Sequence, residues 1–227
     1  MVSPNAPTRK AFLRGATHSA PFFVVIVPFA MLFGVLSAEA GLGPWETQIF
    51  SVAVFAGASQ LAALQLMQDQ APVLIVLATG LAVNLRMMMY SVALTPHLGR
   101  APLGIRALIA YFLVDQSFAL SLAEFEKRAG MTLPEKVAYF FGTMAPIPRI
   151  WNLSTAAGTY LGRAVPDSWG LDFAMPITFI GMTAAMLRTW PHAVAMVVSV
   201  GVTLLLWAMP YGTGLLVGAA CGMAAGA

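Results

Sequence analysis

The chain has 227 residues, of which 59% are hydrophobic and only 9% are charged. A soluble domain carries about a quarter charged residues because its surface faces water. The 12 basic and 9 acidic side chains are too few for a soluble body of this length, and the mean hydropathy of +0.80 agrees. The bases are scattered among the expected loops, which gives no reason to expect a nucleic-acid partner. The composition therefore predicts an integral membrane protein.

The runs without charge define the expected membrane helices. A helix needs about 20 mostly apolar residues to span the hydrocarbon core. On this criterion we predict an all-α, polytopic membrane helix bundle of about seven to eight spans with interrupted helices, in a single domain that covers residues 1–227. The expected segments are 20–38, 47–68, 71–95, 104–123, 136–162, 172–188, 192–209 and 213–226.

The distribution of bases predicts the orientation of the chain. Residues 1–18 carry three bases and resemble the start of a signal peptide, but the apolar run that follows is too long for one. Because Lys and Arg in short loops tend to stay cytoplasmic, we expect a cytoplasmic N-terminal segment and a cytoplasmic loop at 124–136. Four passes between these two segments would place Arg100 and Arg106 on the opposite side, which conflicts with the same rule.

Small residues spaced four apart mark faces on which membrane helices approach each other closely. The last expected segment carries four glycines with this spacing, which we call the glycine stripe: Gly214, Gly218, Gly222 and Gly226. The stripe predicts a close contact with another helix. Two interpretations stay open, namely packing inside the bundle and a docking face for a second polypeptide.

Polar and helix-breaking residues at membrane depth are the candidates for function, because a polar group there needs a partner, a cavity or water. Residues 55–60, "FAGASQ", place small and polar groups in the middle of an expected span, and residues 145–152 combine two prolines with polar groups. Interrupted helices form substrate sites in transporters, and a zwitterion with an apolar side chain would suit this set. The predicted substrate-binding residues are Gly57, Ala58, Ser59, Gln60, Asn84, Arg86, Trp151 and Asn152.

Asp115 lies near the middle of the fourth expected segment. We predict that it couples transport to proton movement, as carboxyls inside membranes do in pumps and transporters. The alternative is a structural salt bridge to Arg86 or Arg149. Gly57 and the range 176–181 interrupt two of the expected segments, and paired interruptions are typical of inverted repeats. An inverted repeat is therefore a candidate feature of the fold.

The sequence carries no signature of catalysis or of a cofactor. The motifs His-Glu-x-x-His and Gly-x-Ser-x-Gly and a Gly-rich phosphate loop are absent. A single cysteine, Cys221, cannot form a disulfide or a cysteine metal site within one chain. We therefore predict a transporter that is not an enzyme and has no metal or cofactor. The alternatives are a channel or pore, whose filter loops or charge rings are not evident, and a membrane-embedded enzyme.

Several motifs resemble those of a known family. They are "PFAMLFG" at 28–34, "FAGASQ" at 55–60, "NLRMMMYS" at 84–91 and "DFAMP" at 172–176. The chain resembles the large subunit of the AzlC-type branched-chain amino-acid exporters, from about residue 12 to residue 226. The family often has His after the Arg of "NLR"; this chain has Met87, which argues against a proton relay there.

The resemblance implies a multi-pass exporter of leucine, isoleucine, valine and sometimes methionine in the bacterial inner membrane. It also implies a small multi-span partner subunit of the AzlD type. We expect the proton-motive force to drive export.

Overall fold

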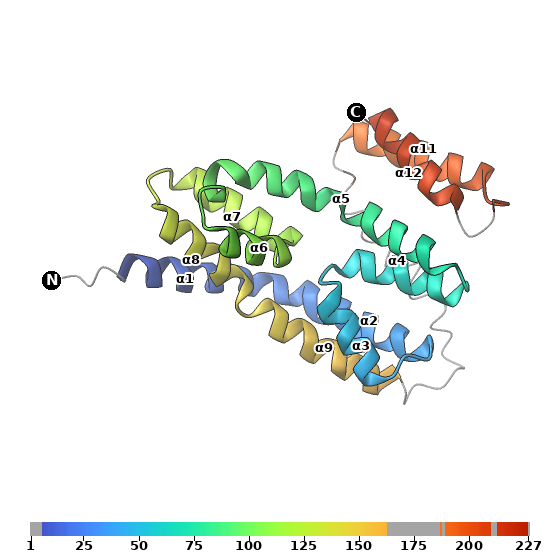
Figure 1. Ribbon diagram of the computed structural model, residues 1–227, viewed down its shortest axis with the longest axis horizontal. Coiled ribbons are helices and arrows are strands. Elements are labelled where there is room, and N and C mark those ends of the chain that lie inside the picture. Colours follow the sequence, from blue (N-terminus) through green and yellow to red (C-terminus); the bar gives the residue numbers. More distant parts are fainter. Residues whose placement is uncertain (1–5, 163–186, 188, 210–212, 227) are drawn as a thin grey trace. The chain divides into compact units, whose positions relative to one another are not determined.

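The computed structural model describes residues 6–162, 187, 189–209 and 213–226 (Figure 1). Every regular element in these ranges is a helix, which confirms the all-α prediction for this part of the chain. The expected segment 172–188 and the range 176–181 lie outside the described residues, apart from Leu187. The elements are α1 (Ala6–Ser19), the 3-10 helix η1 (Ala20–Phe22), α2 (Phe23–Glu39), α3 (Pro44–Ala53), α4 (Gly57–Gln68), α5 (Val73–Leu98), α6 (Leu103–Tyr111), α7 (Asp115–Lys127), α8 (Leu133–Met144), α9 (Ile147–Gly162), α11 (Trp190–Leu205) and α12 (Thr213–Gly226).

The chain forms two compact units. Unit 1 contains residues 6–57 and 84–162 of the described chain, and unit 2 contains residues 58–83 together with α11 and α12. Helix α5 therefore begins in unit 2 and ends in unit 1.

Two of the described helical stretches are long and apolar enough to cross a membrane. The first, Pro7–Glu39, has 33 residues and joins α1 to α2 through η1; the second is α5, with 26 residues. At 1.5 Å per residue the first stretch is about 50 Å long, which exceeds a hydrocarbon core of about 30 Å. The expected N-terminal segment is thus largely helical. Helices α11 and α12 are shorter apolar helices, and the expected number of spans stays a prediction.

Unit 1 is organised by two pairs of parallel helices (Figure 1). Helix α1 packs along α8, where a Cβ on Gly15 would lie 2.9 Å from the Thr143 amide. Helix α2 packs along α9, where a Cβ on Gly34 would lie 2.7 Å from the Thr159 amide. Real Cβ atoms do not approach other atoms this closely. The missing side chains of these glycines therefore let the backbones meet, as small residues do in membrane helix pairs.

Helices α6 and α7 do not form the continuous span expected at 104–123. Helix α6 starts after the short turn 99–102, and the chain turns again at 112–114. Helix α7 then runs alongside the second half of α5: the ring of Phe118 stacks on that of Tyr90, with centroids 4.1 Å apart, and Phe125 lies 5.3 Å from His97. The expectation of one span was wrong here. This stretch is a hairpin that returns to the end of α5.

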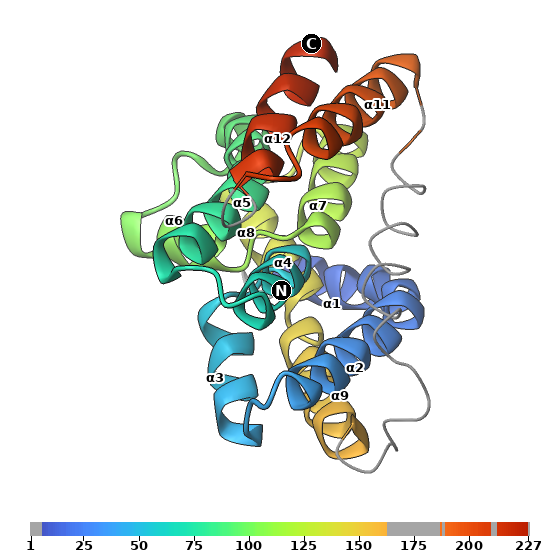
Figure 2. The ribbon, with the colours of Figure 1, turned by 90° about the vertical axis from the view of Figure 1, so that its right-hand side faces the viewer.

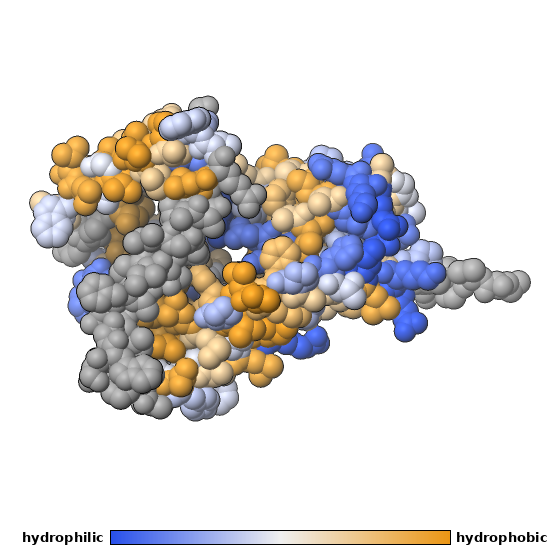
Figure 3. Space-filling view, turned by 180° about the vertical axis from the view of Figure 1, so that it is seen from behind, coloured by the Kyte–Doolittle hydropathy of each residue, from blue (hydrophilic) through white to orange (hydrophobic). Residues whose placement is uncertain are grey.

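Five helix ends lie at one end of unit 1, which we call the basic end: the start of α1, the end of α5, the start of α6, the end of α7 and the start of α8. Lys136 Nζ lies 3.1 Å from His97 Nδ1, which joins α8 to α5. On the face drawn in Figure 3, hydrophilic residues gather around the start of α1. Because α6 returns from its turn as α7, Arg100 and Arg106 lie at the same end as the N-terminal bases. The conflict over their side disappears.

The start of α8 at this end follows from its sequence. Both the amide and the hydroxyl of Thr132 donate to Glu135 Oε2, at 2.8 and 2.7 Å. Pro134 occupies the first turn of the helix, where a missing N–H costs nothing. This capping box fixes where the loop after α7 becomes helix.

Candidate functional site

The "FAGASQ" motif lies at a helix interruption. Helix α3 ends at Ala53 and α4 begins at Gly57, and the Ala56 amide donates to the Val54 carbonyl at 2.8 Å in the turn between them. The predicted break in the second segment is confirmed. A Cβ on Gly57 would lie 2.6 Å from Phe29 Cε1 and 2.8 Å from Trp151 Cη2. Glycine is needed here because two aromatic rings crowd the backbone.

Five aromatic side chains surround this interruption within unit 1. We call them the aromatic cluster: Phe29, Phe55, Tyr111, Phe112 and Trp151. The ring centroid of Phe55 lies 6.2 Å from that of Trp151 and 6.3 Å from that of Phe112, and Tyr111 Oη donates to the Val52 carbonyl at 2.7 Å. The end of α3 therefore meets the turn between α6 and α7. Two helix interruptions share one apolar wall.

Helix α9 contributes the polar rim of the aromatic cluster. Trp151 is buried, and its Nε1 donates to Ser51 Oγ at 2.7 Å. The Gln48 amide donates to the Asn152 carbonyl at 3.1 Å, and Asn152 Nδ2 donates to the Pro148 carbonyl at 2.8 Å. Asn152 Oδ1 is buried and accepts no hydrogen bond from the described residues. A buried acceptor oxygen of this kind is suited to a donor on a ligand.

Asp115 is the first residue of α7, where a carboxylate is favoured by the helix dipole. Its Oδ2 lies 3.2 Å from Arg86 Nη2, and its Oδ1 accepts a hydrogen bond of 2.9 Å from Tyr90 Oη. The salt bridge to Arg86 matches one of the alternatives raised above, and proton coupling stays a prediction. Arg149 instead donates to the Ala145 carbonyl in the link between α8 and α9, at 2.9 Å.

The predicted substrate residues do not all meet in one described place. Gly57, Trp151 and Asn152 line the aromatic cluster and its rim, whereas Arg86 pairs with Asp115. Asn84, two residues before Arg86, points to another side of α5 because residues two apart do not share a helix face. Its Oδ1 is buried without a hydrogen-bond donor among the described residues.

The rest of the motif belongs to unit 2. Ala58, Ser59 and Gln60 follow Gly57 in the first turn of α4, and Ser59 and Gln60 are buried. Ser59 Oγ donates to the Gly80 carbonyl of α5 at 3.0 Å. A Cβ on Gly80 would lie 3.2 Å from Ser59 Oγ. The hydroxyl therefore joins α4 to α5, so that Ser59 has a structural partner.

The glycine stripe of α12 faces α11 in unit 2, and Figure 2 shows the two helices side by side. A Cβ on Gly218 would lie 2.7 Å from the Ser199 carbonyl, and one on Gly222 would lie 2.7 Å from the Ala195 carbonyl. Gly226 meets Ala195 of α11, and Gly214 meets Leu206, the residue directly after α11. Internal packing therefore accounts for the stripe. Docking of a partner subunit stays a prediction, and such a partner would compete with α11.

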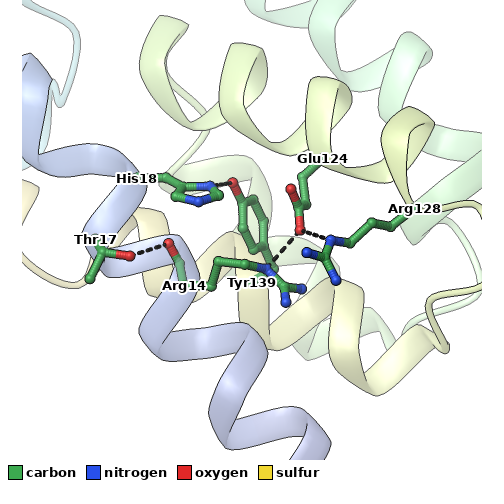
Figure 4. Close-up of polar contacts among 6 residues, drawn as sticks. All are labelled: Arg14, Thr17, His18, Glu124, Arg128 and Tyr139. Carbon is green, nitrogen blue, oxygen red and sulfur yellow. Dashed lines mark hydrogen bonds and ion pairs between the residues drawn. The ribbon is translucent and has the colours of Figure 1, made fainter.

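A cluster of charged and aromatic side chains at the basic end was not predicted (Figure 4). Glu124 is 5% exposed, and its Oε1 lies 2.7 Å from Arg14 Nε and 3.0 Å from Arg128 Nε. Beside it, His18 Nδ1 and Tyr139 Oη lie 2.7 Å apart, and the Tyr139 ring is fully buried. The Glu124 carboxylate joins α1 to α7, and the contact between His18 and Tyr139 joins α1 to α8.

The sequence carries no clear signal for this cluster. In α7 the buried residues are Ser117, Ser121, Glu124 and Phe125, which share one helix face. Three of them are polar, so hydropathy does not mark this face as buried, and the expected charged loop at 124–136 suggested a solvated Glu124.

Long apolar helices, interrupted helices whose breaks lie inside the protein, and a concentration of bases at one end are typical of integral membrane proteins. The chain belongs to the AzlC family: the family described as "AzlC protein" matches residues 21–165, which confirms the resemblance. It is 26% identical to the inner membrane protein YgaZ of Escherichia coli over 194 residues, covering 82% of this chain and 78% of that protein.

Other relatives are also membrane proteins. The chain is 26% identical to an uncharacterized membrane protein of Helicobacter pylori, covering 75% of this chain and 73% of that protein. It is 30% identical to one of Archaeoglobus fulgidus, covering 58% of this chain and 59% of that protein. No solved structure matches.

Proposed function

We propose that the chain is a secondary transporter subunit that exports branched-chain amino acids across the bacterial inner membrane. The carrying observation is the aromatic cluster of unit 1, where the interruption after α3 meets the turn between α6 and α7. Interrupted helices inside membrane proteins expose backbone donors and acceptors to a bound solute. Membership of a membrane-protein family supports the same class of function.

The chemistry of this region suits a zwitterion with an apolar side chain. Phe29, Phe55 and Trp151 offer an apolar wall for a branched side chain. The buried Asn152 Oδ1 offers an acceptor for an ammonium group. Gly57 lets the rings of Phe29 and Trp151 lie against the helix interruption, so that a bulky residue there would displace the rings of this apolar wall.

Orientation, coupling and assembly belong to the same proposal. The basic end of unit 1 faces the cytoplasm, because bases in short loops are retained there. Asp115 couples export to the proton-motive force. A small multi-span membrane subunit of the AzlD type completes the transporter, as the family resemblance implies.

Counter-flow in proteoliposomes tests the transporter against the alternative of a channel or pore. Vesicles that contain the purified chain, with and without the partner subunit, are loaded with unlabelled leucine and diluted into a trace of labelled leucine. A transporter gives transient, saturable accumulation of label, because one site carries both molecules. If labelled leucine only equilibrates across the vesicle membrane, and its uptake does not saturate with leucine concentration, the result would contradict the proposal and favour a pore.

Variants of Gly57 test the position of the site. Gly57→Leu places a side chain against Phe29 and Trp151 and should abolish counter-flow while the protein remains inserted and monodisperse. Gly104→Leu is the matched control, because a Cβ on Gly104 meets nothing within 4 Å. Normal counter-flow in Gly57→Leu would exclude a substrate site beside this glycine.

A further inference from the structure

Unit 1 contains a cavity that the proposed function does not use. It lies between the second half of α5 and α6 and has a volume of about 260 Å³. Its wall is mainly aliphatic, with buried side chains from the two helices and from the turn after α6: Leu94, Leu98, Ile109 and Leu113. The hydroxyl of Thr95 also lines it, but that group already donates to the Ser91 carbonyl at 2.8 Å. The wall therefore suits an aliphatic chain.

Arg106 is the charged residue among the side chains that line this cavity. It stands in the first turn of α6, is exposed, and forms none of the salt bridges between described residues. A guanidinium is always charged in proteins and presents a planar set of donors that fits a carboxylate or a phosphate. The head of an occupant should therefore be an anion.

The lining also excludes the amino-acid substrate as the natural occupant. None of the residues that line the cavity is Asp or Glu, so the ammonium of a zwitterion would have no counter-charge. An anionic amphiphile, with one charged head and an aliphatic tail, matches both the arginine and the wall. A branched-chain amino acid matches only part of this arrangement.

The position of the cavity in the fold favours one kind of anionic amphiphile. Helix α5 has 26 residues, or about 39 Å of helix, which exceeds a hydrocarbon core of about 30 Å, so at least one of its ends reaches the headgroup region. Arg106 lies one short turn after the C-terminal end of α5, at the basic end of unit 1, which faces the cytoplasmic headgroups in the orientation proposed above. Basic pockets between membrane helices bind anionic lipid headgroups. We propose that this cavity binds an anionic phospholipid, with its phosphate at Arg106 and an acyl chain along Leu94 and Leu98.

The test measures lipid binding by the purified full-length chain in a neutral detergent. Native mass spectrometry and thermal unfolding are recorded during titration with dioleoylphosphatidylglycerol. The wild-type chain should bind one lipid molecule that remains bound in detergent, and this binding should raise the unfolding midpoint. Dioleoylphosphatidylcholine and glycerol 3-phosphate should do neither, because one lacks net charge and the other lacks a tail.

Three variants distinguish lipid binding in the cavity from diffuse electrostatic attraction of lipid to the basic end. Arg106→Gln should weaken binding about fivefold, the contribution of one basic residue near an anionic surface. Ala107→Trp should prevent binding by filling the cavity with an indole. Arg9→Gln removes an exposed charge from the same end and should leave binding unchanged.

Each contrary result overturns the assignment. Equal weakening by Arg9→Gln and Arg106→Gln would show that binding is diffuse. Undiminished binding by Ala107→Trp would place the lipid elsewhere. Oleate that binds as tightly as dioleoylphosphatidylglycerol would show that the cavity selects a fatty-acid anion instead of a phospholipid.

Discussion

Gly158→Ala should destabilise the protein through the contact between α2 and α9. A Cβ on Gly158 would lie 2.7 Å from the carbonyl carbon of Met31, and the carbonyl oxygen is closer still. Ordinary van der Waals contact begins at 3.4 Å, so the two helices must separate by at least 0.7 Å. Backbone atoms of a helix cannot rotate away as a side chain can. The added methyl group therefore forces the whole interface apart.

The cost of this separation follows from lost contact and strain. Inserting a methyl group into a well-packed interior costs about 1–3 kcal/mol. For a chain of this size, 1 kcal/mol lowers the unfolding midpoint by about 2–4 °C. We therefore expect Gly158→Ala to unfold about 2–12 °C below the wild-type protein, as followed by circular dichroism in a mild detergent.

Gly104→Ala is the matched control for this experiment. It makes the same chemical change in a helix, but its Cβ meets nothing within 4 Å. Because alanine favours a helix over glycine by about 1 kcal/mol, this variant should be as stable as the wild type or more stable. If Gly158→Ala also gained stability, the close approach of α2 and α9 would be wrong.

Further predictions concern the charged groups and the glycine stripe. Asp115→Asn should retain leucine exchange but lose its response to a pH gradient; a variant that is still driven by pH would make Asp115 structural. Glu124→Gln leaves two arginines without their carboxylate and should cost about 1–3 kcal/mol of unfolding free energy in thermal melts, as loss of a buried polar partner does. Two hydrogen bonds from Thr132 hold the pKa of Glu135 below its usual range. The carboxylate therefore stabilises the fold at any pH above its unfolded-state pKa. This stabilisation is lost as the pH falls through the folded-state pKa. Glu135→Gln should therefore reduce the drop in unfolding midpoint between about pH 5 and pH 3. Gly218→Leu should separate α12 from α11 and lower stability; lost capture of the partner subunit by a chain that stays equally stable would instead favour the docking interpretation.

The parts of the fold that follow local chemistry were predictable. The last segment, expected at 213–226, is α12 with the same bounds, and the second segment ends at Gln68 as expected. The interruption at "FAGASQ" was also predictable, because Gly57 stands between residues that could otherwise continue one helix. In each case the local residue types determine where a helix begins, breaks or ends.

The parts that depend on distant contacts were not predictable in the same way. Apolar residues lie on both sides of Asp115, so a hydropathy profile predicts one continuous segment there. Such a profile gives no information on the direction of the chain after the turn at 112–114. Packing of Phe118 on Tyr90 sets that direction, and nothing in the local sequence reveals it. The burial of Glu124 likewise depends on Arg14, a residue 110 positions earlier (124 minus 14).

The parallel pairing in unit 1 also constrains how the chain can be made. Gly15 meets the region of Gly142, and Gly34 meets that of Gly158, so the partners are separated by 127 and 124 residues (142 minus 15, and 158 minus 34). At about 5–20 residues per second, a ribosome needs roughly 6–25 s to supply the second member of each pair. During this interval α1 and α2 have no α8 or α9 to pack against. Biogenesis of this protein therefore includes a stage in which the first long helical stretch, Pro7–Glu39, is made but has no helix to pack against. During this stage lipid or the insertion machinery covers the face that carries Gly15 and Gly34.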